Sequence, residues 1–185
     1  MVGMYEELKI ILYPDPRLKR VSKPVEKFDE KLGALARRMF ELMRESKGVG
    51  LAAAQVAQNV RLFIVNNTGN LEDDRVYVNP ELFDADSEET GEEGCLSIPE
   101  LHVQITRAKN VRIRAQDLTG KFFEQTESGY LPRIWQHELD HLNGILLTDR
   151  MGPSAKMEHR KLLKDLEDKY AAEHASRKKK TKARK

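Results

Sequence analysis

The sequence predicts a single α+β domain in which a small mixed or antiparallel sheet packs around a central helix, followed by a C-terminal helix and a basic tail. Three observations support this prediction. The chain has 185 residues, which is enough for one domain with its own core. Short runs of aliphatic and aromatic residues, typical of strands, lie between longer segments of helical periodicity. Because the two kinds of segment do not alternate strictly, a doubly wound parallel sheet is disfavoured.

The first element with clear periodicity is a helix expected from Asp29 to Lys47. Its apolar residues recur every three or four positions, which places them on one face. Asp29 is a suitable N-cap, and Gly48 follows the last turn. The apolar face consists of Leu32, Leu35, Ala36, Met39, Phe40 and Met43.

Four strands are expected in the middle of the chain. Each run is rich in aliphatic or aromatic residues and is bounded by Asn, Asp or Gly, which favour turns. The expected strands are Arg61 to Asn66, Val76 to Phe83, Val111 to Ala115 and Phe122 to Thr126.

Two further helices are expected in the last third of the chain. The second helix should span about Leu131 to Leu147, because Pro132 is tolerated in a first helical turn. A third helix should begin near Ser154. Its apolar side would consist of Leu162, Leu163 and Leu166.

The charges are distributed unevenly, although the net charge is only +2. Acidic residues cluster at 72–74 and 88–93, whereas Arg177 to Lys185 is almost continuously basic and has nothing to bury. We therefore expect a catalytic domain over residues 1–175 and a flexible basic tail over residues 176–185. Any contact with nucleic acid would involve this basic end.

Composition and cysteine content indicate an ordinary protein of a reducing compartment. The longest apolar runs are far shorter than the roughly 20 residues that span a bilayer, so no membrane span is expected. The segment from Met1 to Leu8 resembles neither a signal peptide nor a transit peptide. Cys95 is the only cysteine, which excludes an intramolecular disulfide. The expected location is the cytoplasm.

The most specific motif is His137-Glu138-Leu139-Asp140-His141, inside the second predicted helix. Residues four apart lie on one helix face, so both imidazoles can bind one ion. Glu138 is placed to act as a general base on a metal-bound water. The alternative is a charged, solvent-facing helix. The apolar residues around the motif argue against that alternative.

Cys95 is the best candidate for a third ligand, because a catalytic metal site typically has three protein ligands and one open position. It lies in a glycine-containing segment, Gly91 to Ser97, whose backbone can approach an ion and a substrate closely. Two alternatives remain. A lone cysteine is often a small buried hydrophobic residue, and a cysteine-histidine pair can act as a nucleophile.

A third motif, Gly48 to Gln55, superficially fits a dinucleotide-binding fingerprint. It follows a helix rather than a strand, which is the wrong context for that function. A tight loop that lines a cleft is the better interpretation, with the Gln55 amide available to donate a hydrogen bond to developing negative charge. A simple helix C-cap followed by small packing residues is the alternative.

Taken together and in this order, the motifs GVGLAAAQ, EGCLS and QHELDHLNG resemble those of peptide deformylase, the enzyme that removes the N-formyl group of nascent chains. The resemblance extends to Tyr13 to Leu18, Val78 to Pro80 and Arg107. It covers almost everything except the tail.

The resemblance implies a role for each site residue. Cys95, His137 and His141 would bind the metal, which is commonly ferrous iron, with nickel, cobalt or zinc as substitutes. Glu138 would be the acid and base. Gln55 and the Leu96 N–H would stabilise the oxyanion. The residues expected to bind the formylmethionyl substrate are Val49, Gly50, Glu93 and Gly94.

The resemblance also implies an ion pair between Arg107 and Asp140, and ribosomal RNA contact through the C-terminal extension. The reaction would release formate. Two other functions remain open from the residues alone. A zincin-type endopeptidase shares the two-histidine motif but needs a third ligand downstream. An RNA-binding module would have a structural metal site, normally with four protein ligands.

Overall fold

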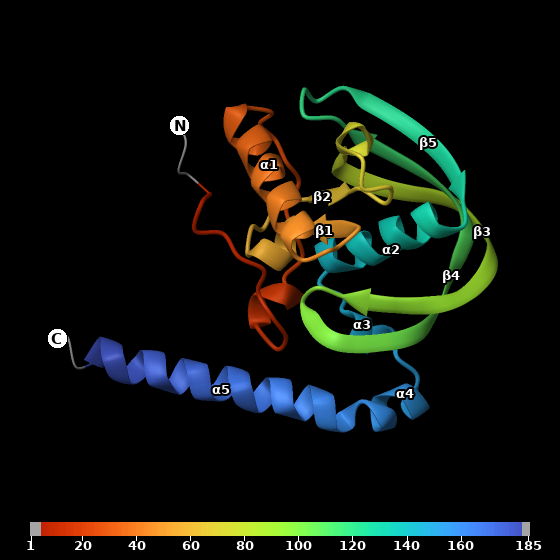
Figure 1. Cartoon of the computed structure of the whole chain (residues 1–185). Helices are drawn as coiled ribbons and strands as arrows, with labels where there is room; N and C mark the ends of the chain where they lie inside the picture. The colour runs from red at the N-terminus through yellow and green to blue at the C-terminus, as the bar shows by residue number, and fades with distance from the viewer. Residues whose placement is uncertain (1–4, 183–185) are drawn as a thin grey trace.

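The computed structural model describes the backbone of residues 5–182 and the side chains of residues 5–175. Its centre is a five-stranded sheet with the strands in sequence order, and neighbouring strands pair antiparallel (Figure 1). The strands are β1 (Gly50–Ala52), β2 (Leu62–Val65), β3 (Arg75–Cys95), β4 (Ile98–Gln116) and β5 (Phe122–Ser128). The expected α+β class is confirmed, and the sheet is antiparallel.

Five α-helices and three short 3₁₀ helices accompany this sheet in the described residues. The α-helices are α1 (Glu30–Glu45), α2 (Tyr130–Leu142), α3 (Leu147–Arg150), α4 (Pro153–Glu158) and α5 (Arg160–Lys182). The 3₁₀ helices are η1 (Pro16–Lys19), η2 (Ala53–Val56) and η3 (Leu71–Asp73). Figure 1 shows α2 enclosed by the curved strands β3, β4 and β5.

Helix α1 confirms the first prediction from periodicity. The Asp29 side chain accepts hydrogen bonds from the backbone N–H groups of Lys31 and Leu32, which caps the helix. All six residues of the expected apolar face are buried. Five of them, all except Ala36, form one hydrophobic cluster with Leu42 and residues of β1 and β2.

Strand β2 is buried on both faces, because each face is covered by a helix. Leu62 and Ile64 pack in the cluster that contains α1. Phe63 and Val65 pack instead in a second cluster, with Trp135 and other residues of α2. Since successive side chains of a strand point to opposite faces, α1 and α2 lie on opposite sides of β2. The central position expected for the second helix is therefore observed.

The hairpin of β3 and β4 is much longer than the sequence predicts. The expected strands ended at Phe83 and began at Val111, because acidic residues have low strand propensity. In the structure the acidic half of β3 pairs with basic residues of β4, which compensates for that propensity. The cross-strand ion pairs are Glu89–Lys109, Asp84–Arg112 and Glu93–Arg107.

Helix α2 is shorter than expected and ends at Leu142 rather than near Leu147. The chain turns at Gly144, whose φ of +71° suits glycine. A side chain there would also collide with the Lys19 carbonyl oxygen, which would lie 2.4 Å from the added Cβ. Leu147 then begins the separate helix α3.

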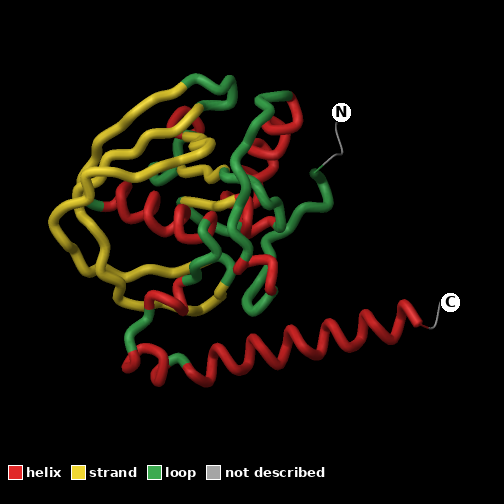
Figure 2. Tube along the Cα trace, turned by 180° about the vertical axis from the view of Figure 1, so that it is seen from behind, coloured by secondary structure: helices red, strands yellow, loops and turns green. Residues whose placement is uncertain are grey.

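The expected third helix is divided into α4 and α5, and α5 lies along one side of the molecule and extends beyond it (Figures 1 and 2). Tyr13 Oη donates a hydrogen bond of 2.7 Å to Glu167 Oε1, which joins α5 to the N-terminal segment. The three leucines predicted for its apolar side are partly buried against the cluster that contains Cys95.

Helix α5 runs to Lys182 and so includes most of the segment expected to be a flexible tail. Alanine, lysine and arginine favour helix, and cations are favourable in a last turn, so a basic run can extend a helix with nothing to bury. Residues 183–185 of that segment, and residues 1–4 of the N-terminal segment considered above, lie outside the described residues. From residue 5 to residue 182, no helix has the length and apolar character of a membrane span.

Two neighbouring residues of β4 test the alternation of buried and exposed side chains along this strand. Ile113 is fully buried and Arg112 is exposed, where it pairs with Glu124. We expect Ile113→Ala to lower the free energy of unfolding by about 2–5 kcal/mol, and Arg112→Ala to lower it far less, because exposed ion pairs contribute little. Urea unfolding of both variants and the wild type measures this. Equal losses would contradict the assigned register.

Candidate metal centre and active site

Two elements bring together the three side chains predicted to bind a metal. His137 and His141 lie one turn apart on α2, and Cys95 lies at the last position of β3. Their ligand atoms all lie within 4.8 Å of one another. Cys95 Sγ is 3.3 Å from His141 Nε2, and the two Nε2 atoms are 3.2 Å apart.

These separations fit a single ion. Two nitrogens at 2.0–2.1 Å from a tetrahedral ion lie about 3.3 Å apart, and a nitrogen and a thiolate sulfur lie about 3.5 Å apart. The observed values are close to both. One thiolate and two imidazoles suit zinc or ferrous iron rather than magnesium or calcium, which prefer oxygen. The donor set and its spacing are thus those of a transition-metal site with an open position.

The backbone near the ligands explains how α2 approaches the sheet so closely. Cys95 pairs with Ile98 across a two-residue turn, so its side chain is held at the tip of the β3–β4 hairpin. Gly50, on β1, faces α2. A Cβ added to Gly50 would lie 2.5 Å from Glu138 Oε1 and 2.8 Å from Ile134 Cγ2. Only glycine permits this contact without displacing Glu138.

His137 is oriented by the carboxylate of Glu93. His137 Nδ1 lies 3.0 Å from Glu93 Oε2. Burial would raise the pKa of Glu93, but hydrogen bonds from His137 and Arg107 lower it to about 2. An ionised carboxylate can only accept, so Nδ1 is the donor, and Nε2 is the nitrogen that faces the other two ligand atoms.

Burial and repulsion by His137 lower the pKa of His141 well below its ordinary value. The neutral imidazole is the form that binds metals. Burial would lower the pKa of His137, but hydrogen bonds with Cys95 and Glu93 raise it well above its ordinary value, so a metal bound here must displace a proton from His137 Nε2.

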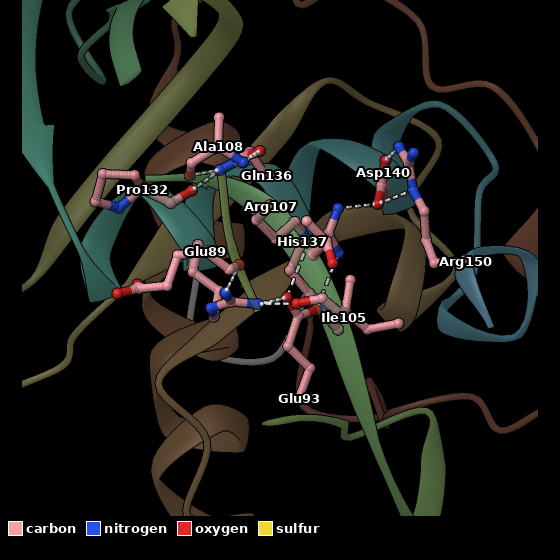
Figure 3. A network of polar contacts seen from close by, with 12 residues as sticks. Glu89, Glu93, Ile105, Arg107, Ala108, Pro132, Gln136, His137, Asp140 and Arg150 are labelled. Atoms are coloured by element: carbon pink, nitrogen blue, oxygen red, sulfur yellow. Dashed lines mark hydrogen bonds and ion pairs between the residues drawn. The ribbon is translucent and has the colours of Figure 1, made fainter. Parts of the chain in front are cut away.

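A row of alternating charges supports this centre (Figure 3). Arg107 donates to both Glu93 oxygens at 2.9 Å and to Asp140 Oδ2 at 2.6 Å. The Arg107–Asp140 pair that the family resemblance implied is thus present. Asp140 also accepts hydrogen bonds of 3.0 and 2.5 Å from Arg150. Arg133 donates to Glu93 from the other side, at 2.8 Å.

Glu138 is buried, and its Oε2 atom has no hydrogen-bond partner among the described residues. Burial raises the pKa of Glu138 to about 7. It is not among the three grouped ligand residues. A carboxyl group of this kind can both accept and release a proton near neutral pH.

The Gln55 amide has a fixed orientation. Its Oε1 accepts a hydrogen bond of 2.9 Å from the Ala52 N–H. Its Nε2 therefore points the other way, where it donates to Ser97 Oγ at 3.2 Å and lies 3.7 Å from Cys95 Sγ. A preoriented donor thus lies beside the ligand group.

A cleft of about 470 Å³ opens onto this centre. It brings together nine of the ten site residues that the sequence predicts; His141, the tenth, lies below it with the other ligands. The predicted residues that line it are Val49, Gly50, Gln55, Glu93, Gly94, Cys95, Leu96, His137 and Glu138.

Three features of the site were not predicted. The side chain of Glu93, a residue expected to bind substrate, is hydrogen-bonded to two arginines and to His137. Ser97 is fully buried and accepts from Gln55. Arg133 is a buried arginine with several partners. The signal for Arg133 was its position four residues before His137, which places both on one helix face.

Comparison with known proteins agrees with this geometry. A sequence model of the family described as polypeptide deformylase matches residues 7–157. A peptide deformylase of Chromobacterium violaceum is 46% identical over 144 residues, which are 78% of this chain and 86% of that protein.

Two solved structures show the same fold. A peptide deformylase from Plasmodium falciparum superposes with a TM-score of 0.87 and 38% identity, over 90% of this chain and 99% of that one. A peptide deformylase from Legionella pneumophila superposes with a TM-score of 0.82 and 41% identity, over 89% of this chain and 97% of that one. The chain therefore belongs to the polypeptide deformylase family, the metal-dependent hydrolases that remove the N-formyl group from nascent polypeptides.

Proposed function

We propose that Cys95, His137 and His141 bind the metal ion of this deformylase and that Glu138 is its acid and base. One observation supports this most strongly. A buried carboxyl group without a hydrogen-bond partner lies beside a three-ligand group, at the floor of a cleft. The open fourth position favours a catalytic centre, because a structural site normally has four protein ligands.

A divalent ion held by Cys95, His137 and His141 would supply Lewis acidity, which lowers the pKa of water and polarises a carbonyl group. Glu138 then accepts the proton of the attacking water and returns it to the leaving amine, giving formate and a free N-terminus. The pKa of about 7 suits both steps. Because Gly50 has no side chain, the Glu138 carboxyl group can lie against it in the lining of the cleft.

Gln55 and Leu96 stabilise the negative charge that develops on the formyl oxygen. Gln55 Nε2 donates from an orientation fixed by Ala52 and Ser97. Leu96 lies in the tight turn directly after Cys95, where its N–H is the second donor. Such donors act without reorganising during the reaction, which is the source of their effect.

The formylmethionyl substrate occupies the cleft along β1 and the end of β3. Val49, Gly50 and Gly94 offer backbone groups there. The Glu93 carboxylate is already hydrogen-bonded to His137 and Arg107. Glu93 therefore binds substrate through its backbone, while its side chain orients His137. This division of roles follows from the burial of its side chain, which is 5% exposed.

The native metal is ferrous iron in this proposal, with nickel, cobalt or zinc as substitutes. The thiolate ligand and the two imidazoles are compatible with all four. A free, buried thiol that must remain reduced favours a reducing compartment, and we place the protein in the cytoplasm.

The competing functions have less support. An endopeptidase of the zincin type would take its third ligand from downstream of the motif, whereas Cys95 precedes it by more than 40 residues. An RNA-binding module with a structural metal would need a fourth protein ligand, and none belongs to the group found in the described residues.

The basic segment over residues 176–185 is the proposed ribosome contact. It is mostly the C-terminal end of α5, which extends beyond the rest of the molecule (Figure 2). Lysine and arginine dominate it and it has no aromatic residue, so it suits phosphate contact rather than base recognition. An enzyme that acts on nascent chains benefits from being held near ribosomal RNA.

Glu138→Gln tests the acid and base. The amide keeps the size of the side chain but cannot take a proton, so turnover should fall by about 10²–10⁴-fold while the metal content stays at the wild-type level. Formate release from a formylmethionyl peptide and metal analysis of the same sample measure this. Glu158→Gln, on the surface of α4, is the matched control. Near wild-type turnover of Glu138→Gln would exclude the assignment.

Two variants that remove positive charge from this segment test the ribosome contact. Replacing Lys178, Lys179 and Lys180 with Gln preserves the chain length and removes three positive charges. We expect unchanged deformylation of a free peptide and weaker co-sedimentation with ribosomes, with the wild-type association falling steeply as salt rises. Deletion after Ala175 should reproduce the loss. If all three proteins sediment alike across the salt series, the segment does not bind ribosomes.

A further inference from the structure

Arg133 lies on α2, one turn before His137, and is almost completely buried, with 7% of its side chain exposed. Its guanidinium group has partners on three strand positions. Arg133 Nη1 donates to Glu93 Oε1 and to the Ile105 carbonyl oxygen, both at 2.8 Å. Arg133 Nη2 donates to the Glu89 carbonyl oxygen at 2.6 Å.

The strand beneath this guanidinium group leaves space for it. A Cβ added to Gly91 would lie 3.1 Å from Arg133 Cζ and 3.2 Å from its Nη2. Nine in ten Cβ contacts in proteins are longer than this, so a side chain at position 91 would require the guanidinium group to shift by a few tenths of an ångström. The absence of a side chain at position 91 therefore permits the position of Arg133.

We propose that Arg133 is a positioning residue of the metal centre, an inference that rests on the proposed function. Helix α2 carries two of the three ligands, and the β3–β4 hairpin carries the third. Arg133 joins them, because its bonds reach both strands of the hairpin. It also holds the Glu93 oxygen opposite the one that orients His137.

An arginine is required by this geometry. Three acceptors lie in different directions around one planar group, and the guanidinium fork matches them. A lysine keeps the charge but has a single nitrogen, so it cannot reach all three. Arg107 does not replace Arg133, because it contacts α2 at the other end of the motif, through Asp140.

The experiment compares metal affinity across four variants of the full chain. Arg133→Met removes the charge and the bonds, Arg133→Lys keeps only the charge, and Gly91→Ala displaces the guanidinium group without altering it. Arg112→Met, an exposed arginine of β4, is the matched control. Zinc affinity is measured by chelator competition, and the visible spectrum of the cobalt-loaded protein reports the ligand geometry. Thermal unfolding without metal reports stability.

We expect zinc affinity to fall by about 10–100-fold in Arg133→Met, a typical loss for a residue that orients metal ligands. Arg133→Lys and Gly91→Ala should lie between it and the wild type and should alter the cobalt spectrum. Arg112→Met should match the wild type. A lower melting temperature with unchanged affinity and spectrum would show a purely structural role and overturn the proposal.

One control, His137→Ala, separates this proposal from the proposed function. His137→Ala must lose metal affinity relative to the wild type; if it does not, the assigned centre is wrong and the inference falls with it. If His137→Ala loses affinity but the Arg133 and Gly91 variants do not, the centre stands and only the role of Arg133 is rejected. Should Arg133→Met not fold, the lysine and Gly91→Ala variants decide the question.

Discussion

The buried carboxylate of Glu93 is the contact on which the arrangement of the site depends. Its two oxygens accept four hydrogen bonds, two from Arg107, one from Arg133 and one from His137. These donors come from β4 and from α2, while Glu93 itself lies on β3, two residues before Cys95. One carboxylate therefore fixes the helix that carries two ligands against the strand that carries the third. Breaking a buried ion pair of this kind typically costs about 3–5 kcal/mol, because a charge is left without a partner.

The charged side chains around the Glu93 carboxylate also favour negative charge at the site. Arg150, Asp140, Arg107, Glu93 and Arg133 alternate in sign, so each of the two carboxylates lies between two guanidinium groups. Three positive and two negative groups leave one positive charge in excess. A thiolate ligand and a developing oxyanion are both negative, and both are stabilised by such an excess in a buried site. The Gln55 amide adds a neutral donor beside Cys95.

Local patterns in the sequence predicted the parts of this site that depend on local geometry. The spacing of His137 and His141 determined their common helix face, and the periodicity from Asp29 to Lys47 identified α1. The long hairpin was not predicted, because its acidic strand is stabilised by pairing with β4 rather than by its own residues. For the same reason the occupied side chain of Glu93 and the role of Arg133 were missed: their partners lie 14 to 44 residues away. The extent of α5 does not follow from any pattern of buried residues, because lysine, arginine and alanine favour a helix without an apolar face.

The most direct test of the account is the coordination of the bound ion, measured by X-ray absorption on zinc-loaded protein. The account predicts one sulfur at about 2.3 Å and two imidazole nitrogens at about 2.0–2.1 Å, with one further light atom completing the shell. Cys95→Ser should remove the sulfur and leave the nitrogens. A shell without sulfur in the wild type, or one closed by four protein ligands, would contradict a catalytic centre formed by Cys95, His137 and His141.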